Sequence, residues 1–297
     1  MRRIPPAYTP CILTLIDELR ARRPAPPADV GEAERRAREV VRSLGGGVVT
    51  LSGGTDSALV LALAAQEWPT GRCVAVTSRS ESIVAGDLTD ARSQAAGAGV
   101  PHVVFEGHEV DLEAFRNNAP DRCFHCKDTL YGAARRVAEE RGLPWVVDGT
   151  NADDLSDHRP GLAAGQRHGV RSPLLEAGLT KPWVRALSKA LGLPTWDKPA
   201  ESCLSSRFPY GTHITREGLR RVADAEEVVK ALGFRVVRVR VHDPVARVEV
   251  PLEDLPALLA PGIRERVVEG LKAQGFTYVA LDLEGFRSGS LNEGLRP

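Results

Sequence analysis

The feature that most constrains the fold is a short apolar segment that runs directly into a glycine-rich loop and then into a helical pattern. Residues 48–51 (VVTL) have the length and composition of a buried strand, residues 52–57 (SGGTDS) form the loop, and residues 56–67 are rich in Ala and Leu. Open α/β sheets bind anionic ligands at the carboxyl ends of their strands, beside a helix N-terminus. The segment therefore predicts an α/β domain with an anion site at this loop.

Strand and helix patterns continue to alternate after this loop. Further strands are expected at residues 72–78, 101–106 and 145–147, and helices at residues 89–97, 111–116 and 127–141. Parallel strands joined by helices form right-handed βαβ units whose sheet is covered on both faces. We therefore expect a doubly wound parallel sheet with helices on both faces.

The pattern changes after about residue 199. A long amphipathic helix is expected at residues 214–232, strands at 235–241, 246–250 and 277–283, and helical segments at 252–259 and 262–274. This order is typical of a separate α+β domain. We predict three parts: an N-terminal extension of residues 1–30 packed on a domain, a nucleotide-binding domain of residues 31–203, and a smaller α+β domain of residues 204–297.

The charge balance and the cysteine count argue against several classes of protein. Lys and Arg total 39 and Asp and Glu total 39, so a protein that holds nucleic acid by bulk electrostatics is not expected. No apolar run approaches the roughly 18 residues of a membrane span, and no secretory signal is evident. The five cysteines are odd in number and too few for a disulfide scaffold. We expect a cytoplasmic protein without membrane or nucleic-acid partners.

The loop carries the groups that hold a nucleotide phosphate. Gly53 and Gly54 allow backbone N–H groups to approach a phosphate closely, Ser52 and Ser57 add hydroxyl donors, and Asp56 can bind Mg²⁺ against a pyrophosphate. Any one of these residues also fits a plain glycine turn with a helix cap, but all of them together after a strand favour a nucleotide site. The loop is not a Walker A motif, and it resembles the PP-loop of the N-type ATP pyrophosphatases. These enzymes cleave ATP between its α and β phosphates and adenylate a carboxylate or carbonyl oxygen.

A second polar segment, residues 148–154, follows a later strand of the expected sheet. By resemblance to that superfamily, it completes the site for ATP and Mg²⁺, with Gly149, Thr150 and Asp154 as binding residues. Asp153 competes with Asp154 for the metal role. The alternative for the whole segment is an ordinary Asp/Asn-rich turn.

Three cysteines stand out by their spacing and context. Cys123 and Cys126 form a CxxC pair at the start of an expected helix, and Cys203 lies far along the chain. A CxxC pair alone is compatible with a redox pair, half of a zinc site or an iron–sulfur ligand pair. Three thiolates without an evident fourth ligand suit a cubane cluster that keeps one iron open to an external ligand. Cys73 is expected in the core, and Cys11 has no evident partner.

The chain as a whole is similar to one family. The resemblance rests on motifs that occur in order at residues 52–57, 120–127, 148–157, 159–161, 171–181, 193–200, 203–207, 238–240, 281–285 and 287–290. Together they resemble the LarE family, the ATP-dependent sulfur transferases of nickel-pincer nucleotide biosynthesis. The likeness runs from about residue 32 to the end and leaves the first 30 residues outside it.

This resemblance implies a two-stage reaction. The family activates a carboxylate of pyridinium-3,5-biscarboxylic acid mononucleotide with ATP and releases pyrophosphate; a sulfur nucleophile then displaces AMP and leaves a thiocarboxylate. Adenylation supplies the leaving group that a carboxylate lacks. Two rounds give the dithio product that later binds nickel in the lactate racemase cofactor. A sulfide or persulfide donor and a homo-oligomeric assembly are also implied.

The resemblance leaves two sulfur sources open. In one type of member, the cysteine at the position of Cys203 gives up its own sulfur and the protein is consumed. In the other type, three cysteines hold a [4Fe-4S] cluster whose unique iron carries a labile sulfide. Because Cys123, Cys126 and Cys203 occur together, our hypothesis is the cluster type, with these thiols and Asp56 as the catalytic groups.

Charged residues of the second domain are the candidates for substrate binding. Arg207, Arg238 and Arg240 are assigned to the substrate phosphate and carboxylates, because guanidinium groups match planar and tetrahedral anions. Arg238 and Arg240 alternate with Val and share one strand face, for which a solvated outer face is the alternative. Glu226 is a further candidate by resemblance, although Glu227 is equally available.

Three other functions share some of these sequence features. A PP-loop enzyme that thiolates tRNA through a three-cysteine cluster would share the chemistry, but the neutral net charge and the lack of a recognisable RNA-binding module argue against it. A zinc-stabilised, non-catalytic nucleotide-binding protein would contain zinc and release no pyrophosphate. An amidotransferase-type synthetase would need a glutamine-hydrolysing partner or domain, for which the chain has no cysteine nucleophile motif.

Overall fold

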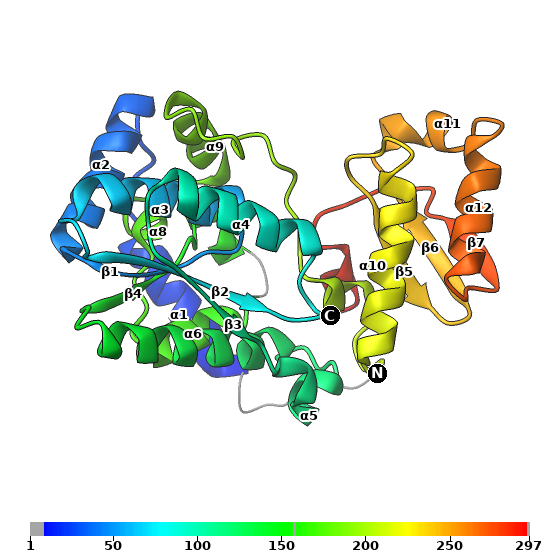
Figure 1. Cartoon of the computed structure of the whole chain (residues 1–297), viewed down its shortest axis with the longest axis horizontal. Helices are drawn as coiled ribbons and strands as arrows, with labels where there is room; N and C mark the ends of the chain where they lie inside the picture. The colour runs from blue at the N-terminus through cyan, green and yellow to red at the C-terminus, as the bar shows by residue number, and fades with distance from the viewer. Residues whose placement is uncertain (1–8, 157–158, 296–297) are drawn as a thin grey trace. The chain divides into compact units, whose positions relative to one another are not determined.

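The computed structural model describes residues 9–156 and 159–295 of the 297-residue chain (Figure 1). The chain divides into two compact units. The first contains residues 1–109 and 120–200, and the second contains residues 110–119 and 201–297. No helix in the described ranges is long and apolar enough to cross a membrane.

A four-stranded sheet forms the centre of the first unit. Its strands β1 (Gly47–Thr50), β2 (Cys73–Arg79), β3 (His102–Glu106) and β4 (Trp145–Val147) are all parallel and lie in the order β3-β2-β1-β4. Val48 and Val49 of β1 belong to two different core clusters and are both fully buried. A strand with both faces covered needs apolar residues in succession rather than in alternation. The expected parallel α/β sheet is confirmed.

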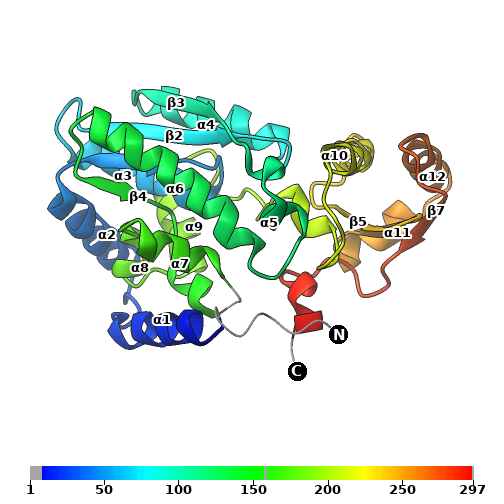
Figure 2. The same ribbon diagram turned by 90° about the horizontal axis from the view of Figure 1, so that it is seen from below.

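Helices cover both faces of this sheet (Figures 1 and 2). One core cluster joins β1 to the helices α2 (Val30–Leu44), α3 (Thr55–Glu67), α4 (Ala85–Gly97) and α9 (Lys181–Ala190). The other cluster joins the opposite face to α6 (Arg122–Glu140) and α7 (Gly161–Arg167). The short helix α8 (Pro173–Glu176) packs on α2 and α3. Helix α6 begins five residues earlier than expected, so the CxxC pair lies inside its first turns.

The N-terminal extension contains helix α1 (Thr9–Arg22), which packs on the first unit. Ile16 is buried against Leu155 in a small cluster at the 3₁₀ turn η2 (Ala152–Ser156). Arg20 donates a hydrogen bond of 2.6 Å to the carbonyl oxygen of Leu155. Cys11 lies in α1, but its side chain is outside the described part of the structure.

The second unit is built on a three-stranded mixed sheet. Strand β6 (Val245–Glu249) pairs antiparallel with β5 (Arg238–His242) and parallel with β7 (Tyr278–Leu281). Helix α10 (Arg216–Lys230) packs on β5 and on α12 (Ile263–Ala273). The remaining short helices of the unit are η3 (Leu204–Arg207), η4 (Leu252–Asp254), α11 (Leu255–Leu258) and η5 (Ser290–Leu295). Strand β5 begins three residues later than expected because residues 235–236 form a bend.

One segment of the second unit comes from the middle of the sequence. Residues 110–119, which contain part of η1 (Glu109–Asp111) and α5 (Glu113–Arg116), fell inside the first domain on sequence patterning. The structure groups them with the second unit, where the carbonyl oxygen of Arg116 accepts a hydrogen bond of 2.8 Å from the amide of Ile214. The Asn118 side chain donates to the carbonyl oxygen of Pro209 at 2.8 Å. These contacts join positions about 90 residues apart in sequence, which local patterning does not detect.

Leu59 of α3 tests the packing of the first unit. Its side chain is fully buried between α3 and the sheet, so Leu59→Ala should lower the free energy of unfolding by about 2–5 kcal/mol. Leu252→Ala, at a position that is 58% exposed, is the control and should change it by less than about 0.5 kcal/mol. Urea denaturation followed by circular dichroism measures both. Equal effects of the two substitutions would contradict this packing.

Candidate active site

The PP-loop lies between the carboxyl end of β1 and the first turn of α3. The hydroxyl groups of Ser52 and Ser57 are hydrogen-bonded to each other at 3.0 Å. The backbone amide of Ser52 donates to the Ser57 hydroxyl at 3.1 Å, and the amide of Gly54 donates to the Ser52 hydroxyl at 3.3 Å. These bonds fold the loop back on itself in front of the helix N-terminus, where backbone N–H groups attract anions.

Two glycines of the candidate site are required by close backbone packing. Gly53 has φ of 79°, and a Cβ there would overlap the backbone carbonyl of Asp87 in α4. A Cβ at Gly149 would lie 2.7 Å from the amide nitrogen of Ser57. Gly149 follows β4, the neighbour of β1 on the side where the strand order reverses. The segments after β1 and β4 therefore meet at the topological switch point, where open α/β sheets bind ligands.

Asp56 is held by residues from two other segments. Its carboxylate forms an ion pair with the ammonium group of Lys181, the first residue of α9. Asn151 donates a side-chain hydrogen bond of 3.3 Å to the same carboxylate. The backbone amide of Lys181 donates in turn to Asp153 at 2.8 Å. Asp56, the predicted Mg²⁺ ligand, thus lies where the PP-loop, the segment after β4 and the start of α9 come together.

Asp148 organises the segment after β4. Its carboxylate accepts hydrogen bonds of 2.7 Å from the hydroxyl groups of Tyr131, Thr150 and Ser172. Burial raises the pKa of Tyr131 well above its usual value, and the charge of Asp148 raises it further. The phenol therefore stays protonated and acts as a donor to the carboxylate. Thr150, a predicted ATP-binding residue, is fixed by this network.

Asp154 lies close to the other acidic groups of the site. It pairs with Arg159 at 2.9 Å and accepts a hydrogen bond of 2.9 Å from the backbone amide of Asn151. Burial raises the pKa of Asp154, Arg159 lowers it, and the charges of Asp56 and Asp148 raise it again. Three carboxylates therefore influence one another in this region.

These carboxylates fit a magnesium–nucleotide site better than a metal site made by protein alone. Over the residues whose placement is described, no three His, Cys, Asp or Glu side chains form a group that could hold a metal ion. Mg²⁺ bound with a nucleotide takes one or two carboxylates and completes its shell with phosphate oxygens and water. Asp56 and Asp154 can supply those carboxylates.

The three cysteines of interest are half-buried and belong to different units. Cys123 and Cys126 lie near the N-terminus of α6 in the first unit, and Cys203 directly precedes η3 in the second. The charge of Cys126 contributes to the raised pKa of Tyr131, so the CxxC pair lies near the Asp148 network. Cys73 is buried in β2 as expected, and burial raises its pKa to about 12.

Arg207 is a fully buried side chain that fixes the loop carrying Cys203. Its guanidinium pairs with both carboxylate oxygens of Glu226 at 2.7 and 2.8 Å. It also donates to the backbone carbonyls of Ser202 and Cys203 at 2.7 and 3.1 Å. Glu226 is buried whereas the neighbouring Glu227 is exposed, so packing distinguishes the two candidates that sequence patterning left open.

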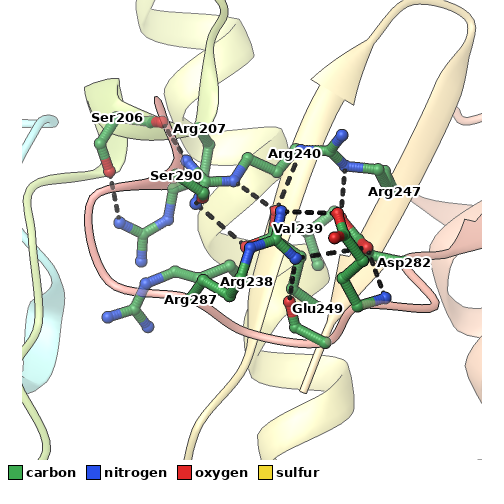
Figure 3. A network of polar contacts seen from close by, with 12 residues as sticks. Ser206, Arg207, Arg238, Val239, Arg240, Arg247, Glu249, Asp282, Arg287 and Ser290 are labelled. Atoms are coloured by element: carbon green, nitrogen blue, oxygen red, sulfur yellow. Dashed lines mark hydrogen bonds and ion pairs between the residues drawn. The ribbon is translucent and has the colours of Figure 1, made fainter. Parts of the chain in front are cut away.

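Arg238 and Arg240 do not lie on a solvated outer face, since both are buried in the second unit (Figure 3). Arg240 pairs with Glu249 at 2.8 and 3.0 Å and donates to Ser290 at 2.8 Å. Arg238 lies over the ring of Phe286, and burial together with the charge of Arg207 lowers its pKa to about 10.

Three buried arginines, Arg207, Arg238 and Arg240, therefore accompany two buried glutamates, Glu226 and Glu249. Buried guanidinium groups need acceptors as partners, and Arg207 and Arg240 have theirs in Glu226 and Glu249. The charges of Glu226 and Glu201 also act on Arg238.

Two lysines were not among the predicted site residues, although both lie in motifs quoted above. Lys181 pairs with Asp56, and Lys198 donates to the carbonyl oxygen of Gly53 at 3.2 Å. Lysine is rare in this chain and occurs only at positions 127, 181, 189, 198, 230 and 272. Their positions within the quoted motifs and the rarity of lysine in a chain whose cations are mostly Arg are the sequence signals for them.

Gly149→Ala tests the close approach of the two loops. The added Cβ would push on the backbone of α3 at Ser57, so we expect the affinity for ATP to fall at least about tenfold, or 1.4 kcal/mol. Gly86→Ala in α4 is the control, because a Cβ there meets nothing within 4 Å. Calorimetric titration with Mg²⁺ and ATP measures both variants. Unchanged affinity in Gly149→Ala would show that the two loops do not form one site.

Glu226→Gln tests the buried ion pair of the second unit. Removing one charge leaves Arg207 buried without its counter-ion, so the free energy of unfolding should fall by about 3 kcal/mol. Glu227→Gln, one residue away on the exposed face of α10, should change it by less than about 0.5 kcal/mol. Thermal and urea denaturation provide the comparison. Equal stabilities of the two variants would exclude a structural role for this pair.

Comparisons with known proteins bear on this site. No family model matches the chain. The chain is 41% identical over 258 residues to an uncharacterized protein of Synechocystis sp. The aligned region covers 87% of this chain and 96% of that protein. It is 39% identical over 250 residues to the pyridinium-3,5-bisthiocarboxylic acid mononucleotide synthase of Lactiplantibacillus plantarum, covering 83% of this chain and 89% of that enzyme.

A more distant similarity covers only part of the chain. The chain is 31% identical over 216 residues to a tRNA-specific 2-thiouridylase of Caulobacter vibrioides. The aligned region covers 57% of this chain and 55% of that enzyme. The similarity to the mononucleotide synthase, in contrast, extends over most of both proteins. The chain therefore belongs to the LarE family of ATP-dependent sulfur transferases.

Proposed function

We propose that this chain uses ATP to convert the carboxylates of pyridinium-3,5-biscarboxylic acid mononucleotide into thiocarboxylates. The observation that carries this proposal is the meeting of the PP-loop with the segment after β4, where Gly149 packs on the first turn of α3. It coincides with the similarity to an enzyme named for the bisthiocarboxylic product. ATP and Mg²⁺ are the cofactors of this reaction.

The first half-reaction takes place at the PP-loop. A substrate carboxylate oxygen attacks the α-phosphorus of ATP, the bond to the bridging oxygen breaks, and pyrophosphate leaves with the electron pair. Ser52, Gly53, Gly54 and Ser57 present donors to the phosphates. Asp56 and Asp154 would hold Mg²⁺, which offsets the charge of the leaving pyrophosphate. Lys181 pairs with Asp56, and its ammonium group would pair with a phosphate oxygen of bound ATP instead.

The second half-reaction replaces AMP by sulfur. A sulfur nucleophile attacks the acyl carbon of the adenylate, a C–S bond forms, and the C–O bond to AMP breaks. We assign the sulfur to a [4Fe-4S] cluster held by Cys123, Cys126 and Cys203. Such a cluster supplies an iron with an open position for a labile sulfide. Free sulfide would renew it directly, and a persulfide donor would renew it together with a thiol that supplies the two electrons.

The residues of this chain suit that assignment in two respects. Cys123 and Cys126 are one helical turn apart near the N-terminus of α6, where the helix dipole favours thiolates. Cys126 also lies within electrostatic range of Tyr131 and so near the Asp148 network of the nucleotide site. The alternative, in which Cys203 gives up its own sulfur, needs only the thiol beside η3.

The second unit supplies the substrate-binding groups. We assign Arg207, Arg238 and Arg240 to a substrate that carries a phosphate and two carboxylates, because guanidinium groups match planar and tetrahedral anions. Arg207 also donates to the backbone carbonyl of Cys203, which supports a role for this arginine beside the thiol. We further propose a homo-oligomer, supported by large apolar side chains exposed on this unit at Leu259, Tyr278 and Leu283.

A second candidate is the thiolation of tRNA, favoured by the similarity to 2-thiouridylases over about half of the chain. The equal numbers of acidic and basic residues argue against it, because nucleic-acid binding needs excess positive charge. A comparison of the pyridinium mononucleotide with unmodified tRNA as sulfur acceptors separates the two functions.

Iron and sulfide content tests the sulfur source. Protein purified without oxygen should be brown and hold about four irons and four to five sulfides per chain, the fifth being the labile sulfide. Cys203→Ala should lose this cluster, because one of three thiolate ligands is missing. Cys11→Ala, a cysteine outside the proposed ligand set, is the matched control and should retain it.

The opposite result would identify the other route. Colourless protein that resists reconstitution with iron and sulfide would exclude the cluster. A mass loss at Cys203 after incubation with ATP and substrate, equal to the conversion of cysteine to dehydroalanine, would then establish sacrificial transfer.

A further inference from the structure

Two hydrogen bonds join the segment that follows α9 to the PP-loop. The hydroxyl group of Thr55, the first residue of α3, donates a hydrogen bond of 2.7 Å to the carbonyl oxygen of Thr195. Lys198 donates to the carbonyl oxygen of Gly53 at 3.2 Å. Residues 195–198 therefore lie directly against residues 53–55 of the loop.

Lys198 is more than a surface contact. Its side chain is 17% exposed and reaches Asp87 at 2.6 Å and Asp90 at 2.5 Å, both on α4. These carboxylates raise the pKa of Lys198 although burial alone would lower it. The ammonium group thus joins three elements at one point: the PP-loop, the first half of α4 and its own segment. On the other side of the segment, Arg185 of α9 donates to the Lys198 carbonyl oxygen at 2.7 Å.

A short stretch of chain leads from Lys198 to Cys203. Cys203 is five residues beyond Lys198, so at most about 18 Å of extended chain separates the two Cα atoms. The last residue of the first unit, Ala200, lies between them. Residues 199–202 are thus a short connection between the contacts of Lys198 and Cys203.

Two buried polar groups at the junction have no hydrogen-bond partner among the described residues. They are the hydroxyl group of Thr195 and the carboxamide oxygen of Gln94, whose amide nitrogen donates to Gly53 at 2.9 Å. Buried unsatisfied groups cost free energy. A second arrangement of the loop, in which both groups have hydrogen-bond partners, would be lower in free energy. Binding of a nucleotide can therefore change the contacts between the loop and residues 195–198.

We propose that Lys198 is a positioning residue that couples occupation of the PP-loop by a nucleotide to the placement of the segment carrying Cys203. The inference rests on the proposed function, in which adenylation at the PP-loop must precede sulfur transfer at the thiol. Its role is to link the PP-loop to the chain that leads to Cys203, so that a nucleotide bound at Gly53 restrains that chain. Lys198 itself touches no reacting atom.

Hydrogen–deuterium exchange of the full chain measures this coupling directly. The probe is Mg²⁺ with α,β-methylene-ATP, which the PP-loop can bind but not cleave. In the unsubstituted chain, the nucleotide should slow exchange in the peptide of residues 199–206 by about fivefold or more, as a coupling between sites requires. Lys198→Met should bind the nucleotide with less than about a threefold change in affinity but should lose this protection.

Two further variants sharpen the comparison. Thr55→Val keeps the side-chain shape and removes the hydroxyl donor to Thr195, so it should weaken the protection without abolishing it. Lys272→Met replaces an exposed lysine of α12 in the second unit and should leave the protection unchanged.

Three results would overturn the inference. They are protection in Lys198→Met equal to that of the unsubstituted chain, no change at residues 199–206 when the unsubstituted chain binds the nucleotide, and complete loss of nucleotide binding in Lys198→Met. The last would make Lys198 part of the nucleotide site rather than a link. Failure of the unsubstituted chain to bind the nucleotide at all would overturn the proposed function itself.

Discussion

The first unit depends on a direct backbone contact between the segment after β4 and the first turn of α3. This contact leaves no room for a side chain at Gly149. Gly149, after β4, lies against the amide of Ser57 in the first turn of α3, and a Cβ would leave only 2.7 Å between them. The contact arises because β1 and β4 are neighbours in the sheet while their helices lie on opposite faces. It brings Asp56 within hydrogen-bond distance of Asn151. The polar groups of the PP-loop and those of the segment after β4 are thereby brought together at one edge of the sheet.

The second unit is organised by buried charge instead. Arg207 pairs with Glu226, Arg240 pairs with Glu249, and Arg238 adds a positive charge to the same interior. Such pairs cost desolvation energy and define a geometry more than they add stability. Here the geometry includes the backbone of Cys203, which accepts a hydrogen bond from Arg207. The position of the Cys203 backbone therefore depends on the buried pair of Arg207 and Glu226.

Much of this arrangement follows from local sequence, and the rest depends on contacts between distant residues. Apolar runs and the glycine-rich loop predicted the parallel sheet and the position of the PP-loop, because each is encoded in a few consecutive residues. The alternation at Arg238 and Arg240 predicted a strand, but it could not reveal that both faces of that strand are buried. The preference for Glu226 over Glu227 arises only when α10 packs on β5.

The contacts of Lys181 and Lys198 illustrate the same limit, since their partners lie more than 100 residues away. Local patterning likewise did not predict that residues 110–119 belong to the second unit. Long-range hydrogen bonds to residues 209–214 hold them there. Sequence patterning is strongest where one element carries the signal. It is weakest where two elements must meet before a side chain acquires its role.

The products of ATP cleavage provide the most direct test of the proposed chemistry. The purified chain is incubated with ATP, Mg²⁺ and pyridinium-3,5-biscarboxylic acid mononucleotide, and the nucleotides and phosphates are separated and quantified. Cleavage at the PP-loop should yield AMP and pyrophosphate in equal amounts, and only when the pyridinium substrate is present. Formation of ADP and inorganic phosphate, or of AMP in amounts that do not depend on that substrate, would contradict adenylation of its carboxylates.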